Sequence, residues 1–494
     1  MKEKLEKQYL NVKKSTLVDI ANKIREKTGS TDLIKVKDLD DAIANIGGSS
    51  AGETGHLVRY IDADGTVLHT EYVENGGKLT PPSNPSCDPN YIIFDEWNYD
   101  VENYIVEQPT DVGAIYKTVD DVTYMICRFN AKTGLSPALR ITGFTSIDWG
   151  DGTVDSSNSH TYAEDGEYII KISGDFSFDT NLSTYVMGSQ SLNQSIKAAY
   201  LKNGLSTISM GAFRMCSSLT CVTIPSSVTS IGTEVFDECT SLLSITIPNG
   251  VSMINGLLKE CYALKNASLP NSLLYMEDSS VSTYSRGYVF GSCRSLEYVV
   301  IPKSVTTISK NTFNSCYSLI NVVIPDEVTT INDNAFDGCE SLNNIVLSNN
   351  VTNIGNGIFR SCNCLKQITL SEGITVIPMN TFAHCYPLES VHIPSGVTEI
   401  GKYAFQECQV LKNVTIPSSV TTIGSQSFER CTSLTDVFID CETVPSLASA
   451  DAFGDYNSAL IFWVNDSIIE DLKVATNWST YADIIKPRSS YPNI

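Results

Sequence analysis

Apolar residues recur at fixed spacings through the second half of the chain, and the segment 313–331 shows the pattern most clearly. In Leu319-x-x-Val322-x-Ile324 the apolar positions alternate, which predicts a short strand with one buried face. Pro325 predicts the end of this strand, because proline has no N–H to donate to a ladder. Apolar residues three and six positions beyond the proline predict a second buried side of the same coil.

This unit repeats with one cysteine per copy. The steps are 23 residues, apart from one of 22 and one of 32. A fixed period of this length predicts a solenoid, here of ten coils, and coils too small to fold alone must stack on one another. The cysteines are Cys216, Cys239, Cys261, Cys293, Cys316, Cys339, Cys362, Cys385, Cys408 and Cys431.

The repeated pattern C-x-x-L-x-x-V-x-I-P-x-x-V-x-x-I-G-x-x-A-F resembles the BspA-like class of leucine-rich repeat, over residues 196–440. The resemblance implies a mainly β solenoid of ten 22–32-residue repeats. The chain departs from the general leucine-rich repeat at the turn, where Ser227 stands in place of an asparagine, so we expect this turn to be held differently. The ladder cysteines are expected to be free, packed thiols, since cysteine behaves as a small buried hydrophobe. Disulfides between neighbouring coils are the alternative.

Residues 1–48 predict a helical hairpin, with apolar positions at helical spacing and glycines that end each helix. The segment 20–29, together with Asp41-Ala42-Ile43, resembles a short module of phage tail and baseplate-associated proteins. This resemblance implies attachment to tail or baseplate proteins, and a generic hairpin for homo-oligomerisation is the alternative. Residues 49–55 are rich in glycine and serine and predict a flexible linker.

Two small β modules are expected between this linker and the solenoid. In residues 56–115, an Asp64-Gly65 turn inside Tyr60–Leu68 predicts a hairpin, and the segment resembles the internalin-type β-grasp repeat, which implies a spacer. In residues 116–180, Trp149-Gly150-Asp151-Gly152-Thr153 and His160-Thr161-Tyr162 resemble a PKD-type immunoglobulin-like sandwich. We interpret Asp151-Gly152 as a hairpin turn and Trp149 as a core residue; a Ca²⁺ site at Asp148 and Asp151 is the weaker alternative. Residues 441–494 predict a cap that covers the last coil.

The chain carries a formal net charge of −22, and residues 49–196 are the acidic part, with 7 basic and 22 acidic side chains. An acidic chain argues against nucleic acid as a partner, because binding to the phosphate backbone needs a basic face. The longest apolar run, 459–464, is too short to span a bilayer. The charged residues 1–7 do not have the form of a secretory signal.

The catalytic motifs that we looked for are missing from the sequence. It has no G-x-x-x-x-G-K-[ST] loop, no H-E-x-x-H and no G-x-S-x-G elbow. The five histidines are scattered and no paired C-x-x-C motif is present. We therefore expect no enzyme activity, no cofactor and no metal site.

The repeat offers a binding surface instead. Two positions of each L-x-x-V-x-I strand face outward and form two rows, one rich in amides that suit sugar hydroxyls or peptide backbone, and one that starts with three valines expected to form an exposed apolar strip. The alternative is that these residues are simply common in strands. A second candidate is the insertion in the 32-residue coil. The first row is Tyr298, Asn321, Asn344, Gln367, Ser390 and Asn413, the second is Val300, Val323, Val346, Thr369, His392 and Thr415, and the insertion contributes Tyr284, Arg286 and Tyr288.

These modules without an export signal predict a non-enzymatic adhesin on a phage or prophage tail, assembled in the host cytoplasm. Its solenoid would contact a bacterial surface protein or glycan. A bacterial cell-surface or secreted leucine-rich repeat adhesin is the alternative, and a glycan hydrolase on the same scaffold is the third interpretation. No membrane insertion is expected.

Overall fold

The computed structural model describes residues 55–85, 90–129, 138–178, 194–276, 288–343 and 345–491. The hairpin expected at 1–48 lies outside these residues, as does the expected linker up to its last residue, Gly55. The chain divides into two compact units, which are described separately. The first comprises Met1–Met253, Cys261–Leu273 and Val299–Pro302, and the second comprises Ile254–Glu260, Leu274–Tyr298 and Lys303–Ile494.

The first unit begins with a four-stranded sheet in the order β2-β1-β6-β4, in which β1 and β6 are parallel and the other pairs are antiparallel. A buried cluster that includes Tyr60 and Trp97 forms its core. We call residues 55–118 the first β domain; its last strand extends slightly beyond the expected boundary at 115. Its strands are β1 (Gly55–Ile61), β2 (Val67–Glu74), β3 (Gly77–Lys78), β4 (Ile92–Trp97), β5 (Ile105–Val106) and β6 (Thr110–Thr118).

A second sheet connects directly to the solenoid, in the order β10-β9-β11-β7-β13-β15. Strand β13 pairs antiparallel with β7 on one side and parallel with β15, the first coil's strand, on the other. The sheet therefore covers the first coil. The strands outside the repeats are β7 (Thr123–Phe129), β8 (Ile141–Thr142), β9 (Ser146–Asp148), β10 (Val154–Asp155), β11 (Gly166–Ser173), β12 (Ser177–Phe178) and β13 (Ile196–Tyr200).

The W-G-D-G-T segment forms the turn expected of it. Trp149 is fully buried, and its carbonyl accepts a hydrogen bond of 2.8 Å from the Tyr162 hydroxyl. The Asp151 carboxylate accepts from the backbone N–H of Thr153 at 3.0 Å and lies 2.7 Å from His160 Nε2. These contacts account for both motifs as parts of one turn and its packing.

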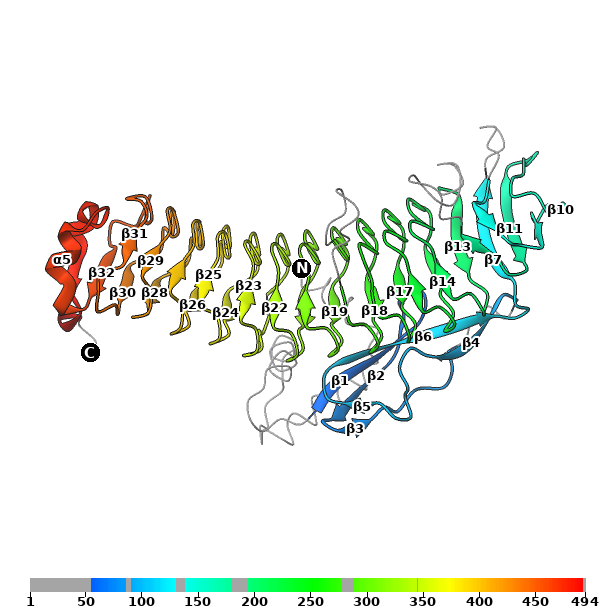
Figure 1. The fold of residues 1–494 in the computed structure, drawn as a ribbon, viewed down its shortest axis with the longest axis horizontal. Helices are drawn as coiled ribbons and strands as arrows, with labels where there is room; N and C mark the ends of the chain where they lie inside the picture. The colour runs from blue at the N-terminus through cyan, green and yellow to red at the C-terminus, as the bar shows by residue number, and fades with distance from the viewer. Residues whose placement is uncertain are drawn as a thin grey trace, which may run out of the picture. The chain divides into compact units, whose positions relative to one another are not determined.

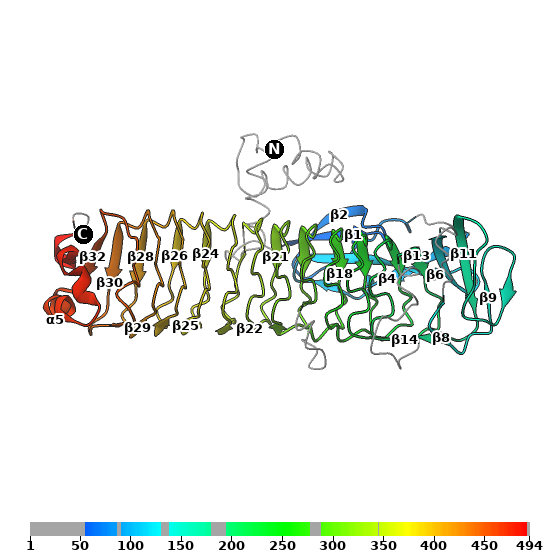
Figure 2. The same cartoon turned by 90° about the horizontal axis from the view of Figure 1, so that it is seen from above.

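Most solenoid coils contribute a longer strand from the L-x-x-V-x-I segment, here called a front strand, and most add a two-residue back strand. In the coil of Cys339, the described residues of this segment make only a single bridge, from Val346 to Thr369. Neighbouring coils pair in parallel and in register, as β28 does with β30 and β20 with β22. Figure 2 shows β24, β26, β28 and β30 in one row of the second unit and β25 and β29 in the opposite row. The expected mainly β solenoid is confirmed.

The front strands are β15 (Cys221–Thr223), β17 (Ser244–Thr246), β18 (Asn266–Ser268), β19 (Tyr298–Val300), β21 (Asn321–Val323), β24 (Gln367–Thr369), β26 (Ser390–His392), β28 (Asn413–Ile416), β30 (Asp436–Ile439) and β32 (Ile461–Val464). The back strands are β14 (Thr207–Ile208), β16 (Ser230–Ile231), β20 (Thr307–Ile308), β22 (Thr330–Ile331), β23 (Asn353–Ile354), β25 (Val376–Ile377), β27 (Glu399–Ile400), β29 (Thr422–Ile423) and β31 (Ser446–Leu447).

The interior of the coils is built from one phenylalanine and one cysteine per turn. In the second unit, Phe313 and Phe336 stack with ring centroids 5.4 Å apart, and the stack continues to Phe453. The ladder cysteines are buried free thiols, as expected. Each thiol after the first also donates to a carbonyl of the preceding coil, as Cys339 Sγ does to Phe313 O at 3.2 Å. Cysteine therefore fills space and satisfies a backbone acceptor at the same position.

The corner before each cysteine requires a left-handed backbone. The residue directly before every ladder cysteine has a positive φ, for example 62° at His384 and 60° at Glu407. Non-glycine residues adopt this conformation at a cost of roughly 1–2 kcal/mol each. The packing of each coil against its neighbours must therefore offset this cost.

Serines hold the turn where a general leucine-rich repeat has asparagine. Ser227 Oγ donates to Leu205 O at 2.8 Å in the preceding coil and accepts from Gly204 N at 3.0 Å. Ser272 makes the same two bonds, to Val251 O and from Gly250 N. A hydroxyl that both donates and accepts thus joins adjacent turns.

The coil packing continues past residue 440, where the cysteine period ends. Phe453 stacks on Phe428 at 5.0 Å although 25 residues separate them instead of 23, so the last turns absorb two additional residues. Strand β32 follows in parallel, and Trp478 and Tyr481 pack on the exposed end of the phenylalanine stack. The cap expected at 441–494 therefore begins with solenoid-like structure. Its remaining elements are η2 (Asp466–Ile468), α5 (Ile469–Val474), η3 (Trp478–Ile484), β33 (Ile485–Pro487) and η4 (Arg488–Ser490).

Candidate binding surface

The outward side chains of the front strands form the candidate surface, called the front face. On strands β24, β26 and β28 of the second unit these side chains are exposed. The coil positions them because inward residues such as Ile368 and Val414 are buried, so their neighbours must point away from the core. We call this region the open front face: Gln367, Thr369, Ser390, His392, Asn413 and Thr415.

The equivalent side chains of strands β15, β17 and β18, in the first unit, are mostly buried. Ser244 and Ser268 are each 1 % exposed, and Thr223 and Thr246 are also buried. Polar outward residues are rarely buried without a partner. We call this region the covered front face.

The first β domain lies across the covered front face, as Figure 1 shows for β6 passing over the first coils. Asn98 makes the central contact. Its amide nitrogen donates to Ile247 O at 3.3 Å and to Ser268 Oγ at 2.9 Å, and its amide oxygen accepts from Gly113 N at 2.7 Å. One buried side chain thereby joins strands of the domain to two coils.

Two front-face side chains also donate to the domain's backbone. Asn266 Nδ2 donates to Gly65 O at 3.0 Å, and Ser268 Oγ donates to Asp111 O at 2.8 Å. The carboxylate of Asp111 is itself held by Arg59, at 2.6 and 2.7 Å. The covered front face thus holds two backbone carbonyl groups of the domain, one in the turn between β1 and β2 and one on the extended strand β6.

The close approach of β6 depends on Gly113. A Cβ at this position would lie 2.4 Å from Thr246 Oγ1 and 2.8 Å from Ser268 Cβ. Such contacts do not occur between real atoms, so any side chain at residue 113 would push the strand away.

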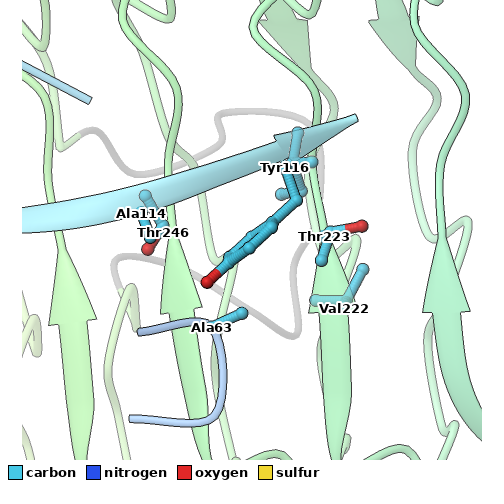
Figure 3. Close-up of a pocket in the computed structure, with 7 residues that line it drawn as sticks. Ala63, Ala114, Tyr116, Val222, Thr223 and Thr246 are labelled. Carbon is cyan, nitrogen blue, oxygen red and sulfur yellow. The ribbon is translucent and has the colours of Figure 1, made fainter. Parts of the chain in front are cut away.

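A small cavity remains where the domain meets the coils, shown in Figure 3. Tyr116 of β6 and Ala63 face Val222 and Thr223 of β15 across it. Its volume is about 10 Å³, which is room for about one water and not for a ligand. The Tyr116 hydroxyl is engaged by Asp62.

The residues predicted as a binding surface lie in different environments. The expectation of an exposed strip of three valines is wrong, because Val300 is 4 % exposed and Val323 is half-buried, whereas Val346 is 47 % exposed. Tyr298 and Asn321 are half-buried, and Asn344 lies outside the described residues. Gln367, Thr369, His392 and Asn413 are exposed and lie together on the open front face.

The second candidate surface lies largely outside the described part of the chain. Tyr284 and Arg286 belong to the segment 277–287, which is not described, and Tyr288 is half-buried with Lys259 Nζ 6.0 Å from its ring centroid. No binding surface can be built from one residue of the three.

Charged side chains on the second unit pair along the coils. On the open front face, His392 Nε2 lies 3.1 Å from Glu372 Oε1. At the cysteine corners, Glu407 contacts His384 at 3.3 Å and Arg430 at 3.0 Å. Burial acts to raise the pKa of Glu407, but the hydrogen bonds from Arg430 and His384 outweigh it and hold this pKa below its ordinary value.

The described residues contain no group of three His, Cys, Asp or Glu side chains that could hold a metal ion. In the same residues, no helix has both the length and the apolar character that crossing a membrane requires. The candidate Ca²⁺ carboxylates are accounted for by the turn, since Asp148 accepts from Gly150 N at 2.9 Å and Asp151 from Thr153 N.

Sequence reasoning missed that the first coils are covered. A signal was present: the outward residues of β15, β17 and β18 are small, whereas later coils carry Gln, His and Val at these positions. Small side chains permit the close approach of another strand. Nothing in the repeat itself says which segment approaches.

The model for the BspA type leucine-rich repeat region matches the chain in six copies, at residues 189–286, 283–409 and 375–459. Together these matches span more than half of the 494 residues. The chain belongs to the BspA type leucine-rich repeat family.

Several solved structures resemble this BspA type repeat protein. A leucine-rich repeat protein from Bacteroides ovatus is 21 % identical, over 66 % of this chain and 98 % of that one, with a TM-score of 0.42. A leucine rich cell surface protein from Faecalibacterium prausnitzii is 22 % identical, over 58 % and 86 %, with a TM-score of 0.33. The pneumococcal vaccine antigen PcpA is 18 % identical, over 59 % and 78 %, with a TM-score of 0.42. No curated protein gives a significant match.

Proposed function

We propose that this protein is a non-enzymatic bacterial surface or secreted adhesin whose open front face binds a surface protein or glycan. The observation that carries the proposal is the contrast between the two parts of the front face. The covered part is already occupied by the chain's own first β domain, while Gln367, Thr369, His392 and Asn413 stand exposed on consecutive coils. Family membership supports the same function, because stacked repeats present extended binding surfaces.

The test is adhesion of the fluorescently labelled full chain to a panel of bacterial cells. Replacing Thr369 and Thr415 together by glutamate places two charges on the open front face, and we expect at least a tenfold loss of adhesion. Asn353→Glu is the matched control, because Asn353 is exposed on a back strand. Unchanged adhesion of the double variant, with wild-type circular dichroism and melting temperature, would reject this surface.

The absence of enzymatic activity is part of the proposal and has its own test. Purified protein would be incubated with cell-wall glycans, and released reducing ends would be measured. Turnover above that of a heat-denatured sample would replace the adhesin by a glycan hydrolase.

The finer proposal places the protein on a phage or prophage tail. It rests on the segments 20–29 and 41–43, which lie outside the described residues. If residues 1–48 attach the protein to tail or baseplate proteins, deleting them should abolish incorporation into tail particles and leave adhesion of the free protein intact. Flanking genes for surface and secretion proteins would instead support the bacterial surface.

A further inference from the structure

The covered front face shows what kind of chain this repeat can hold. Asp111 O accepts from Ser268 of β18, and Gly113 of the same strand lies against Thr246 of β17. Further along β6, Tyr116 faces β15. The bound segment is therefore an extended strand that crosses successive coils, and the coils bind it partly through its backbone.

The sequence of the binding coil recurs on the open front face. Residues 264–269 read L-K-N-A-S-L, residues 365–370 read L-K-Q-I-T-L, and residues 411–416 read L-K-N-V-T-I. All three carry an amide at the third position and a hydroxyl at the fifth. In the first copy these two side chains, Asn266 and Ser268, donate to the backbone carbonyls of Gly65 and Asp111.

In the other two copies the same groups are available. Gln367, Thr369, Asn413 and Thr415 are exposed, and their side chains make no hydrogen bond within the described part of the chain. Coils paired in parallel lie about 4.8 Å apart, so the two copies, two coils apart, lie about 10 Å from each other. An extended segment rises about 3.3 Å per residue, and four to six residues would cross both.

We propose that the open front face binds an extended polypeptide segment of a partner protein through its backbone carbonyl groups. The amides of Gln367 and Asn413 and the hydroxyls of Thr369 and Thr415 are the donors. This inference rests on the adhesin function proposed above and chooses protein over glycan as its ligand. The choice follows from the precedent in the chain itself, where an amide and a hydroxyl in the same pattern hold two peptide carbonyls, that of Gly65 in a turn and that of Asp111 on the extended strand β6.

The test uses a synthetic peptide with the sequence of residues 108–118 as probe, and the full chain as receptor. We expect saturable, weak binding by biolayer interferometry. The double variant Gln367→Ala/Asn413→Ala should bind at least fivefold more weakly, and Thr369→Val/Thr415→Val should show a similar loss. Asn353→Ala is the matched amide control and should stay within twofold of the wild type.

A helix-forming peptide of equal length, rich in alanine, lysine and glutamate, is the ligand control, because its carbonyls are already bonded internally. It should not bind. Failure of the 108–118 peptide to bind, equal binding of the two peptides, or binding that the front-face variants leave unchanged would each overturn the inference. If cell adhesion depends on Thr369 and Thr415 but the peptide does not bind, the adhesin proposal stands and this inference is rejected. If the front-face variants lose neither cell adhesion nor peptide binding, both proposals are rejected.

Discussion

The covered and the open parts of the front face have the same backbone and related sequences, yet only one is free for a ligand. Ser268 is buried beneath the first β domain, whereas Thr415, at the same position of its coil, is exposed. The repeat determines where a side chain points. What lies over the coil determines whether that side chain can bind anything from outside.

The covered part also carries polar side chains that are typical of a solvent-facing strand. The hydroxyls of Thr223, Ser244 and Thr246 are buried with no hydrogen-bond partner among the described residues. An unsatisfied buried polar group costs about 1–3 kcal/mol. The attachment of the first β domain to the coils must therefore depend on a few well-formed contacts, chiefly those of Asn98.

The largest effect is expected from Asn98→Ala. This change removes three hydrogen bonds and leaves buried partners such as Gly113 N unpaired. We expect a loss of about 3 kcal/mol in unfolding free energy, measured by urea denaturation of the first unit's tryptophan signal. Asn103→Ala, an exposed amide of the same domain, should change stability by less than about 0.5 kcal/mol. Equal losses of stability in Asn98→Ala and Asn103→Ala would show that Asn98 does not hold the first β domain on the coils.

Gly113→Ala should have the next largest effect. The added methyl group meets Thr246 and Ser268, and overpacking of this kind costs about 1–3 kcal/mol. Hydrogen exchange at 244–246 and 266–268 should rise as the strand lifts. The control is Gly396→Ala, because a Cβ there meets only two backbone oxygens, at 3.8 Å. Unchanged exchange in Gly113→Ala would contradict the close approach of β6.

A matched pair of amides separates the two parts of the front face directly. Asn266→Ala removes the bond to Gly65 O and should cost about 1 kcal/mol. Asn413→Ala, at the same repeat position on the open face, should cost less than about 0.5 kcal/mol while it weakens ligand binding. The opposite ranking in thermal denaturation would remove the distinction between covered and open.

The smallest effect concerns pH and the open part of the repeat. Because the folded-state pKa of Glu407 lies below its ordinary value of 4.5, its ion pairs stabilise the protein above that value. This contribution is lost as the pH falls through the lower folded pKa. Glu407→Gln should therefore lower the melting temperature slightly at pH 7 and leave it nearly unchanged at the acid end. A variant that loses as much stability at low pH as at neutral pH would contradict this pairing.

The sequence predicts the coils well because each one repeats the same local solution. Cys339, for example, lies between Phe336 and Leu342 as the period requires, and all three are buried. Where Leu258 replaces the usual phenylalanine, its carbonyl still accepts a hydrogen bond from the cysteine of the next coil, Cys293 Sγ, at 3.1 Å. Local pattern is enough for these features because neighbouring coils supply their partners.

Contacts between distant segments could not be predicted in this way. Asn98 and Ser268 are 170 positions apart, and no periodicity links them. The expected valine strip failed as well, because Val300 is buried whereas Val346, at the same place in the repeat, is exposed. The small outward residues of β15, β17 and β18 indicated that another segment could approach the first coils, but not which segment.

The most direct test of the covered and open front face compares two free cysteines. Cys221 faces outward on β15, and its pKa is raised to about 12, first by burial and then by Asp64 and Asp62 of the first β domain; Cys364 is exposed on the second unit. Alkylation of the native full chain with iodoacetamide, quantified residue by residue by mass spectrometry, should modify Cys364 at least roughly tenfold faster than Cys221. Gly113→Ala should raise the rate at Cys221 and leave the rates at Cys364 and at the ladder residue Cys316 unchanged. Equal rates at Cys221 and Cys364 in the wild-type protein would show that the first coils are not covered.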